Sequence, residues 1–161
     1  YNLSYNPSEM RLHIEGGSVT GPIVGRFNTN ETDEQRFSFE QAGDFVYIRT
    51  QFDGRYITVD VSDGNTSPPA QGLGIKQDLK YEGGQALIDP AKFNIKYQLW
   101  KFAPLNNLEA GRNLFTVTNA FFPNLVLRPL DLLNNAVPII LGNKVPDYPN
   151  LWFVSGPIMS K

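Results

Sequence analysis

The chain has 161 residues, about two in five of them hydrophobic, which is enough for one globular domain with a buried core. Its 14 basic and 16 acidic residues nearly balance, so we expect no nucleic-acid partner and no attraction to an anionic membrane. Cysteine is absent and no apolar run has the length of a membrane helix, which excludes a thiol nucleophile, a disulfide framework, a cysteine-based zinc site and a membrane-inserted helix.

The chain begins at Tyr1 without an initiator Met, and its first residues, YNLSY, already alternate as a strand does. We therefore expect a processed chain or a domain cut from a longer protein. Helical signals are nearly absent, because 14 Gly and 12 Pro interrupt the sequence too often for long helices. Short strands with frequent turns between them predict an all-β sandwich or barrel. In chain order, the clearest later strands are FVYIRT (45–50), RYITVDV (55–61), NLFTVT (113–118), NLVLRP (124–129) and VPIIL (137–141).

One short pattern occurs three times: an amide side chain, any residue, an aromatic residue, any residue and an apolar residue. The copies are QRFSF (35–39), QLWKF (98–102) and NLWFV (150–154). Residues 45–59 can also be laid on residues 114–128 without a gap, because both have the pattern strand, short turn, strand. An internal repeat is therefore predicted. It divides a single domain, 1–161, into units of roughly four strands at 1–42, 43–111 and 112–161.

These three copies, together with GRYITVDVSDG (54–64) and PNLVLRP (123–129), resemble the ricin B-type lectin family. The resemblance implies an all-β fold, the β-trefoil, with three four-stranded repeats and pseudo-threefold symmetry; a β-sandwich is the alternative. The aromatic residues of the copies, Phe37, Trp100 and Trp152, are expected in the core. The amides that precede them, Gln35, Gln98 and Asn150, could support a neighbouring loop or reach a ligand hydroxyl.

The second repeat is the best candidate for a sugar site. In the resembled family an Asp at the end of the second strand contacts sugar hydroxyls, and either Thr58 or Asp60 falls at that place. Tyr97 stands where the family has Asn, which weakens the match. An Asp and Asn cluster here can also be an ordinary hydrogen-bonded turn. The residues expected to contact a sugar in this repeat are Thr58, Asp60, Asp63, Asn65, Gln77, Tyr97 and Gln98.

The other two repeats depart further from the family pattern. In the third, Arg128 lies near the carboxylate position, with Asp131 and Asn150 as further polar candidates; an Arg there could recognise an acidic group or be a plain surface residue. In the first, His13 or Glu15 lies near the corresponding position.

Sequence motifs for catalysis are lacking. His13 is the only histidine, no serine lies in a nucleophile elbow, and no phosphate-binding glycine loop occurs. Asp60 and Asp63 could form a carboxylate pair of the glycosidase kind, but such pairs sit in deep clefts. We therefore expect no enzyme, no cofactor and no metal.

The leading hypothesis is a non-catalytic carbohydrate-binding domain whose partners are glycans or polysaccharides, held at shallow loop sites. The first alternative is a protein-binding trefoil such as a protease inhibitor, which would use loop 62–69 or loop 143–150. The second is an ancillary domain of a larger secreted enzyme. A secreted or cell-surface setting is favoured, and the absence of cysteine does not exclude the cytoplasm.

The second repeat also contains a long insertion, with SPPAQG (67–72) and the stretch 80–97. Long connections in compact domains are usually functional or mobile. Its aromatic residues Tyr81, Phe93 and Tyr97 could form an aromatic surface or fold back against the barrel.

Overall fold

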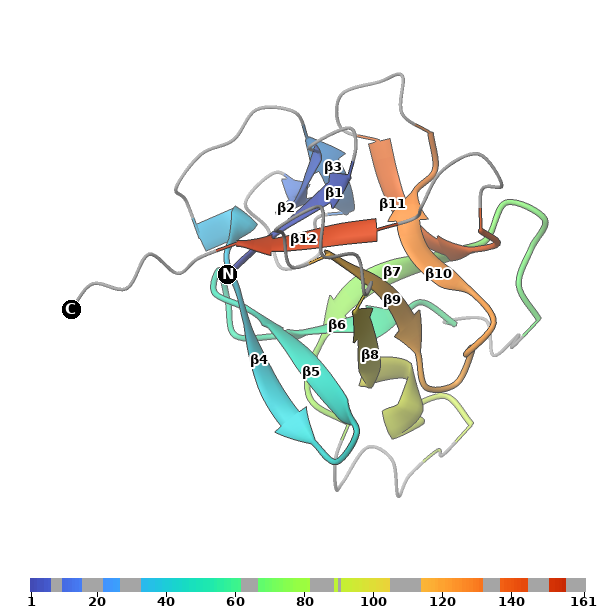
Figure 1. Cartoon of the computed structure of the whole chain (residues 1–161). Coiled ribbons are helices and arrows are strands. Elements are labelled where there is room, and N and C mark those ends of the chain that lie inside the picture. Colours follow the sequence, from blue (N-terminus) through green and yellow to red (C-terminus); the bar gives the residue numbers. More distant parts are fainter. Residues whose placement is uncertain are drawn as a thin grey trace.

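The computed structural model describes residues 1–6, 10–15, 22–26, 33–61, 67–81, 89, 91–104, 114–131, 137–144 and 151–155. These residues form twelve strands and two short 3₁₀ helices, η2 (Asp33–Gln35) and η3 (Ile95–Gln98), and no α-helix (Figure 1). The strands are β1 (Asn2–Asn6), β2 (Met10–Ile14), β3 (Ile23–Arg26), β4 (Phe37–Ala42), β5 (Phe45–Thr50), β6 (Tyr56–Val59), β7 (Leu73–Asp78), β8 (Trp100–Pro104), β9 (Leu114–Asn119), β10 (Val126–Pro129), β11 (Val137–Gly142) and β12 (Leu151–Ser155).

The strands form a closed barrel with three hairpins attached. β1 pairs with β12, β12 with β9, β9 with β8, β8 with β5 and β5 with β4. Two backbone hydrogen bonds of 2.8 Å between Tyr1 and Phe37 close the ring. The hairpins are β2–β3, β6–β7 and β10–β11, and β11 also pairs with β3 and β7. The β-trefoil predicted from the sequence is therefore confirmed, and the β-sandwich alternative is wrong.

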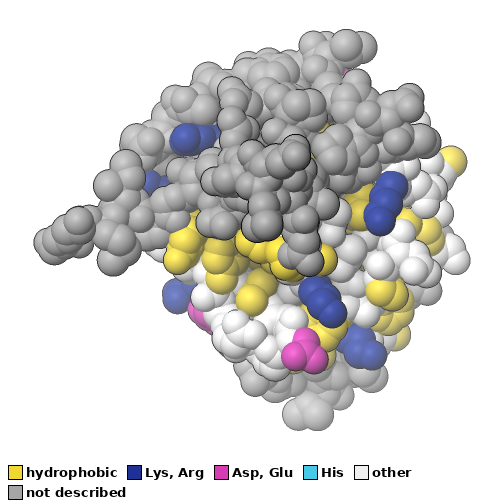
Figure 2. All heavy atoms as spheres, in the orientation of Figure 1, with side chains coloured by type: hydrophobic (Ala, Val, Ile, Leu, Met, Phe, Trp, Pro, Cys, Tyr) yellow, Lys and Arg dark blue, Asp and Glu magenta, His cyan; other side chains and the backbone are white. Residues whose placement is uncertain are grey.

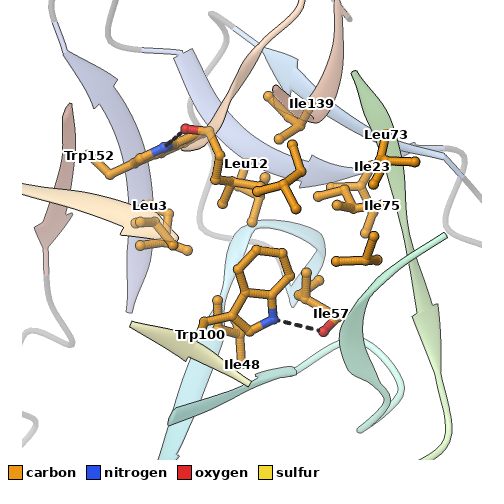
Figure 3. Packing of buried hydrophobic residues seen from close by; sticks show 14 of the residues in the cluster. Leu3, Leu12, Ile23, Ile48, Ile57, Leu73, Ile75, Trp100, Ile139 and Trp152 are labelled. Atoms are coloured by element: carbon orange, nitrogen blue, oxygen red, sulfur yellow. Dashed lines mark hydrogen bonds between the residues drawn. The ribbon is translucent and has the colours of Figure 1, made fainter. Parts of the chain in front are cut away.

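Two tryptophans hold equivalent places in the second and third repeats. The indole Nε1 of Trp100 donates a hydrogen bond to the carbonyl of Ile57 (3.0 Å), and that of Trp152 donates to the carbonyl of Leu127 (2.8 Å) (Figure 3). Both side chains are fully buried, as is Phe37 in the first repeat, so all three aromatic residues lie in the core as expected.

The same bonds correct the gapless alignment made from the sequence. That alignment lays Ile57 on Val126, whereas the indole bonds make Ile57 equivalent to Leu127. The reason is a turn of unequal length: residues 51–55 join β5 to β6, and residues 120–125, one residue more, join β9 to β10. Before the turn, the gapless alignment holds. It lays Val46 on Phe115, and these two residues pair with the equivalent tryptophans, Trp100 and Trp152.

The aromatic residues of the insertion fold back against the barrel. Tyr81 and Tyr97 are almost fully buried members of the hydrophobic core, and Phe93 packs against it. The rings of Tyr81 and Phe93 meet edge to face with centroids 5.2 Å apart, a favourable arrangement for two aromatic rings. The alternative of an aromatic binding surface on these three residues is wrong.

Another row of aromatic rings follows the barrel wall. Tyr1 contacts Phe39, Phe39 contacts Phe102 and Phe102 contacts Phe115, with centroids 5.1 to 5.8 Å apart. Figure 2 shows hydrophobic side chains gathered in this part of the molecule, between the N-terminus and β8 of Figure 1. Tyr1 is the exposed member of the row, and the other three are partly buried.

Candidate functional site

Backbone hydrogen bonds identify one position in each repeat just after the second strand. Glu15, Asp60 and Leu130 hold it, because their N–H groups donate to the carbonyls of Pro22, Gly74 and Pro138, all at 2.9 Å. The same equivalence places His13, Thr58 and Arg128 two residues earlier. Asp60 is thus the second repeat's carboxylate at the end of the strand, and Thr58 belongs to the strand itself.

In the second repeat this position opens onto a polar face of the β6–β7 hairpin. Val59 and Val61 are buried in the core, so Asp60 between them points to the opposite side, with 40% of its side chain exposed. The register of β7 brings Lys76 and Asp78 to the same face, since Thr58 pairs with Lys76 and Tyr56 with Asp78. We call Asp60, Lys76 and Asp78 the second-repeat site.

The three charges of the second-repeat site lie in a row. The Nζ of Lys76 is 3.9 Å from Oδ1 of Asp60 and 3.6 Å from Oδ2 of Asp78, so one ammonium stands between two carboxylates. All three side chains are partly exposed. At these distances the pairs are charge contacts, longer than direct hydrogen bonds.

Asp78 is held in place by its neighbours. The hydroxyl of Tyr81 donates to Oδ2 of Asp78 (2.6 Å), and the N–H of Leu79 donates to Oδ1 (2.8 Å). Burial, with the nearby Asp78 carboxylate as the second cause, raises the pKa of the Tyr81 phenol far above its usual value, so the hydroxyl remains a donor. Tyr81 therefore fixes the direction of one carboxylate of the site.

Thr58 shares the strand face of Asp60 and Lys76, but its hydroxyl is bonded to Gln98, and neither side chain is open to a ligand. Both are completely buried. The Nε2 of Gln98 donates to the Thr58 hydroxyl (3.1 Å) and to the carbonyl of Leu79 (2.8 Å), and its Oε1 accepts from the N–H of Tyr81 (2.9 Å). The expectation of a sugar contact is corrected for both residues: their polar atoms are taken up in holding the start of the insertion against β6.

Tyr97 and Gln77 are also interior residues. Tyr97 is 1% exposed, its hydroxyl donates to the carbonyl of Ala91 (3.1 Å), and burial raises the pKa of its phenol. Gln77 is buried on β7 opposite Ile57, on the other side of the strand from Lys76 and Asp78. Neither side chain lies on the exposed face where a sugar contact was expected.

At the three positions equivalent to the second-repeat site, the third repeat has neither an acidic nor a basic residue. Leu130, 38% exposed, takes the place of Asp60, while Ile140 and Gly142 take the places of Lys76 and Asp78. Arg128 is bound to backbone carbonyls instead: Nε donates to Asn143 (2.7 Å) and Nη1 to Pro129 (3.0 Å). Asp131 is half-buried just beyond Leu130. The remaining expected contacts, Asp63, Asn65 and Asn150, lie outside the described residues.

In the first repeat the carboxylate is already paired. Arg26 donates to both oxygens of Glu15, from Nε to Oε2 at 2.7 Å and from Nη2 to Oε1. This hydrogen bonding holds the pKa of Glu15 below its usual value and raises that of Arg26. Beside the pair, Nδ1 of His13 lies 3.1 Å from Nε2 of the buried Gln35, and burial lowers the pKa of His13.

Sequence reasoning missed Lys76, Asp78 and Tyr81. The signal for the first two was the period-2 alternation of Leu73–Asp78, in which every second residue is buried. Within the described part of the chain, no group of three His, Asp or Glu side chains is arranged to hold a metal ion. The described helical segments include none with the length and apolar character to cross a membrane.

No protein-family model matches the chain, and no curated protein matches it. Solved structures do, and they are β-trefoil proteins that include ricin B-like lectins. The designed three-fold symmetric protein ThreeFoil has a TM-score of 0.73 and 15% identity, over 96% of this chain and 97% of that one. The Macrolepiota procera ricin B-like lectin, solved with lactose, has a TM-score of 0.63 and 15% identity over 94% and 91%. The C-half of the earthworm R-type lectin, solved with GalNAc, has a TM-score of 0.58 and 16% identity over 95% and 94%.

Some similar structures are much longer proteins. The chain spans 29% of the exo-β-1,3-galactanase 1,3Gal43A from Clostridium thermocellum, at a TM-score of 0.68 and 18% identity. At identities this low, the likeness shows the fold alone.

Proposed function

We propose that the chain is a non-catalytic carbohydrate-binding domain that holds a glycan at the second-repeat site. The observation that carries the proposal is the row of Asp60, Lys76 and Asp78 on an exposed face. A sugar hydroxyl is both a donor and an acceptor, so two carboxylates that accept and an ammonium that donates can bind adjacent hydroxyls. The similar lectins solved with lactose and GalNAc support the same class of ligand.

The site is suited to binding rather than to hydrolysis. Hydrolysis by two carboxylates needs one of them protonated as the acid and both placed across a scissile bond. Here an ammonium lies between the carboxylates and neutralises part of their charge, and both carboxylates are partly exposed. A shallow site of this kind orients a sugar through hydrogen bonds and does not enclose it.

A glycan array probed with the isolated chain tests the proposal, with lactose-terminated and GalNAc-terminated glycans among the probes. Asp60→Asn keeps the shape of the side chain and removes its charge, and Lys76→Met keeps most of the length and removes the ammonium. We expect each variant to weaken binding at least about tenfold, the effect of losing one charge-assisted hydrogen bond. Absence of binding to every glycan, or full binding by Asp60→Asn, would contradict the proposal.

One alternative keeps independent support. The chain matches about a third or less of some longer proteins, the 1,3Gal43A galactanase among them, which favours an ancillary domain that attaches a larger enzyme to its substrate. Pull-down on an insoluble galactan separates this role from recognition of short terminal sugars. The protease-inhibitor alternative stays a prediction, because most of loops 62–69 and 143–150 lies outside the described residues.

A further inference from the structure

The faces equivalent to the second-repeat site differ in chemistry from one repeat to the next. The second repeat presents Asp60, Lys76 and Asp78. The corresponding residues are Glu15, Val24 and Arg26 in the first repeat and Leu130, Ile140 and Gly142 in the third. We infer that one chain binds one glycan, at the second repeat, although its fold supplies three equivalent faces. The inference rests on the proposed function.

The three equivalent positions of the third face, all among the described residues, carry no carboxylate and no ammonium. The side chain of Leu130 can neither donate nor accept a hydrogen bond, and Ile140 is 6% exposed. Gly142 provides no side chain, and the space above it is occupied, because a Cβ there would lie 3.3 Å from Nη2 of Arg128. Arg128 itself donates to two backbone carbonyls. A polar sugar at this face would lose hydration and would meet no carboxylate at the equivalent positions, only a guanidinium already bonded to the backbone, which is unfavourable.

The first face keeps a carboxylate but uses it internally. Both oxygens of Glu15 accept hydrogen bonds from Arg26, a bidentate arrangement that is stronger than a single neutral hydrogen bond. The place of Lys76 is taken by Val24, which is 4% exposed. A sugar that bound here would have to compete with the guanidinium for the carboxylate. In the second repeat the ammonium is 3.6 to 3.9 Å from its carboxylates and offers far less competition.

A single binding face per chain would determine whether the protein can cross-link glycans. A chain with two or three sites cross-links glycan-bearing particles by itself, whereas a chain with one site only coats them. The partner is then an individual glycan chain, and cross-linking would require a second copy of the protein.

The number of sites can be measured directly. We would titrate lactose, and in a separate series GalNAc, into the protein in a calorimeter, after light scattering has established its oligomeric state. A stoichiometry of about one sugar per chain supports the inference, and a value of two or three overturns it. If neither sugar produces heat or competes with array binding, and the glycan array is also empty, the proposed function is overturned and the inference with it.

Matched variants distinguish one strong site from several weak ones. Asp60→Asn should remove the binding of lactose and GalNAc, whereas Glu15→Gln and Leu130→Ala, at the two equivalent positions, should leave stoichiometry and affinity unchanged. Residual saturable binding in Asp60→Asn that disappears in the double variant with Glu15→Gln would show a second site and overturn the inference. Circular dichroism of each variant shows whether a loss of binding reflects unfolding.

Discussion

The side-chain amide of Gln98 donates a hydrogen bond of 3.1 Å to the hydroxyl of Thr58, a residue forty positions earlier in the chain. The same amide also bonds the carbonyl of Leu79 and the N–H of Tyr81, where the insertion begins. Gln98 therefore joins a hairpin strand, the start of the insertion and η3. Through Tyr81 this interior network determines where Asp78 points on the surface.

We predict that Gln98→Leu destabilises the fold much more than Thr58→Val. The leucine leaves the buried N–H of Tyr81 and the partly buried carbonyl of Leu79 without this partner and also removes the buried bond to Thr58, which costs about 3 kcal/mol in free energy of unfolding. The valine keeps the shape and removes two hydrogen bonds, one from Gln98 and one to the carbonyl of Tyr56, and should cost about 1 to 2 kcal/mol. Urea unfolding followed by fluorescence measures both. Equal losses would contradict the role of Gln98 as the central residue of the network.

The indole hydrogen bonds of the two tryptophans should contribute alike. Trp100→Phe leaves the carbonyl of Ile57 buried without its donor, and Trp152→Phe does the same to Leu127. We expect each change to cost about 2 to 4 kcal/mol, from the lost hydrogen bond and the smaller ring together. Tryptophan fluorescence of the single variants, followed through urea unfolding, reports both. The prediction fails if either substitution costs less than about 0.5 kcal/mol, the scale of a neutral surface change.

The fold could be predicted because its signals are local. Strand alternation and the repeated aromatic residues Phe37, Trp100 and Trp152 are visible in short windows, and burial of these three follows from their size. The register of the third repeat could not be predicted, because a single additional residue between β9 and β10 leaves the strand pattern unchanged while it shifts every later match.

The site was harder to predict because it depends on contacts between distant segments. The sequence left Thr58 and Asp60 as the two candidates for the end of the strand, and the backbone bond of Asp60 to Gly74 decides between them. Lys76 and Asp78 reach the same face only through the register of β7 against β6 across a long connection, which no local pattern specifies. Thr58 was the alternative to Asp60 at the end of the strand, and Gln98 was expected either to support a loop or to reach a ligand. Tertiary packing buries both and pairs them with each other, so Gln98 supports the loop.

Two glycines with positive φ should respond differently to alanine. At Gly72 (φ 98°) a Cβ would lie 2.9 Å from the backbone oxygen of Leu141 and 2.9 Å from the side chain of Ile140, where β7 meets β11. At Gly43 (φ 66°), in the turn between β4 and β5, nothing lies within 4 Å. We expect Gly43→Ala to cost about 1 kcal/mol from backbone strain alone. Gly72→Ala adds overpacking and should cost about 3 kcal/mol or more.

Thermal unfolding of the two glycine variants side by side tests this difference. The melting temperature of Gly72→Ala should fall by several degrees more than that of Gly43→Ala. Similar melting temperatures would mean that β7 and β11 separate at little cost, contrary to their close approach at Gly72.

The hydroxyl of Tyr81 should matter for glycan binding as well as for stability. Tyr81→Phe keeps the buried ring against Phe93 and removes only the donor to Asp78. We expect roughly a threefold to tenfold weaker binding to the array ligands, because the Asp78 carboxylate loses one of its two fixed donors, and about 1 kcal/mol of lost stability. Phe93→Leu, which disturbs the same ring contact without touching Asp78, is the control. A larger effect on binding from Phe93→Leu would contradict a positioning role for the hydroxyl.

His13 should make the fold less stable in mild acid. Burial lowers the pKa of His13 in the folded chain below its usual value near 6.5; the facing Glu15 and Glu34 oppose this shift and Arg26 adds to it. Between the lowered folded pKa and about 6.5, the unfolded chain binds more protons at this residue than the folded chain does. The contribution of neutral His13 to stability is therefore complete above about pH 6.5 and is lost as the pH falls through the folded pKa.

The variant His13→Gln isolates this effect, because glutamine can still hydrogen-bond to Gln35 but does not titrate in this range. The free energy of unfolding of the wild type should fall more steeply from pH 7.5 to pH 5 than that of the variant. The variant therefore gains stability relative to the wild type as the pH falls. The pH range stays above the region where Glu15, whose pKa is lowered by Arg26, begins to protonate. Urea unfolding at half-unit pH intervals measures both slopes, and parallel curves would show that His13 titrates alike in the folded and unfolded chains.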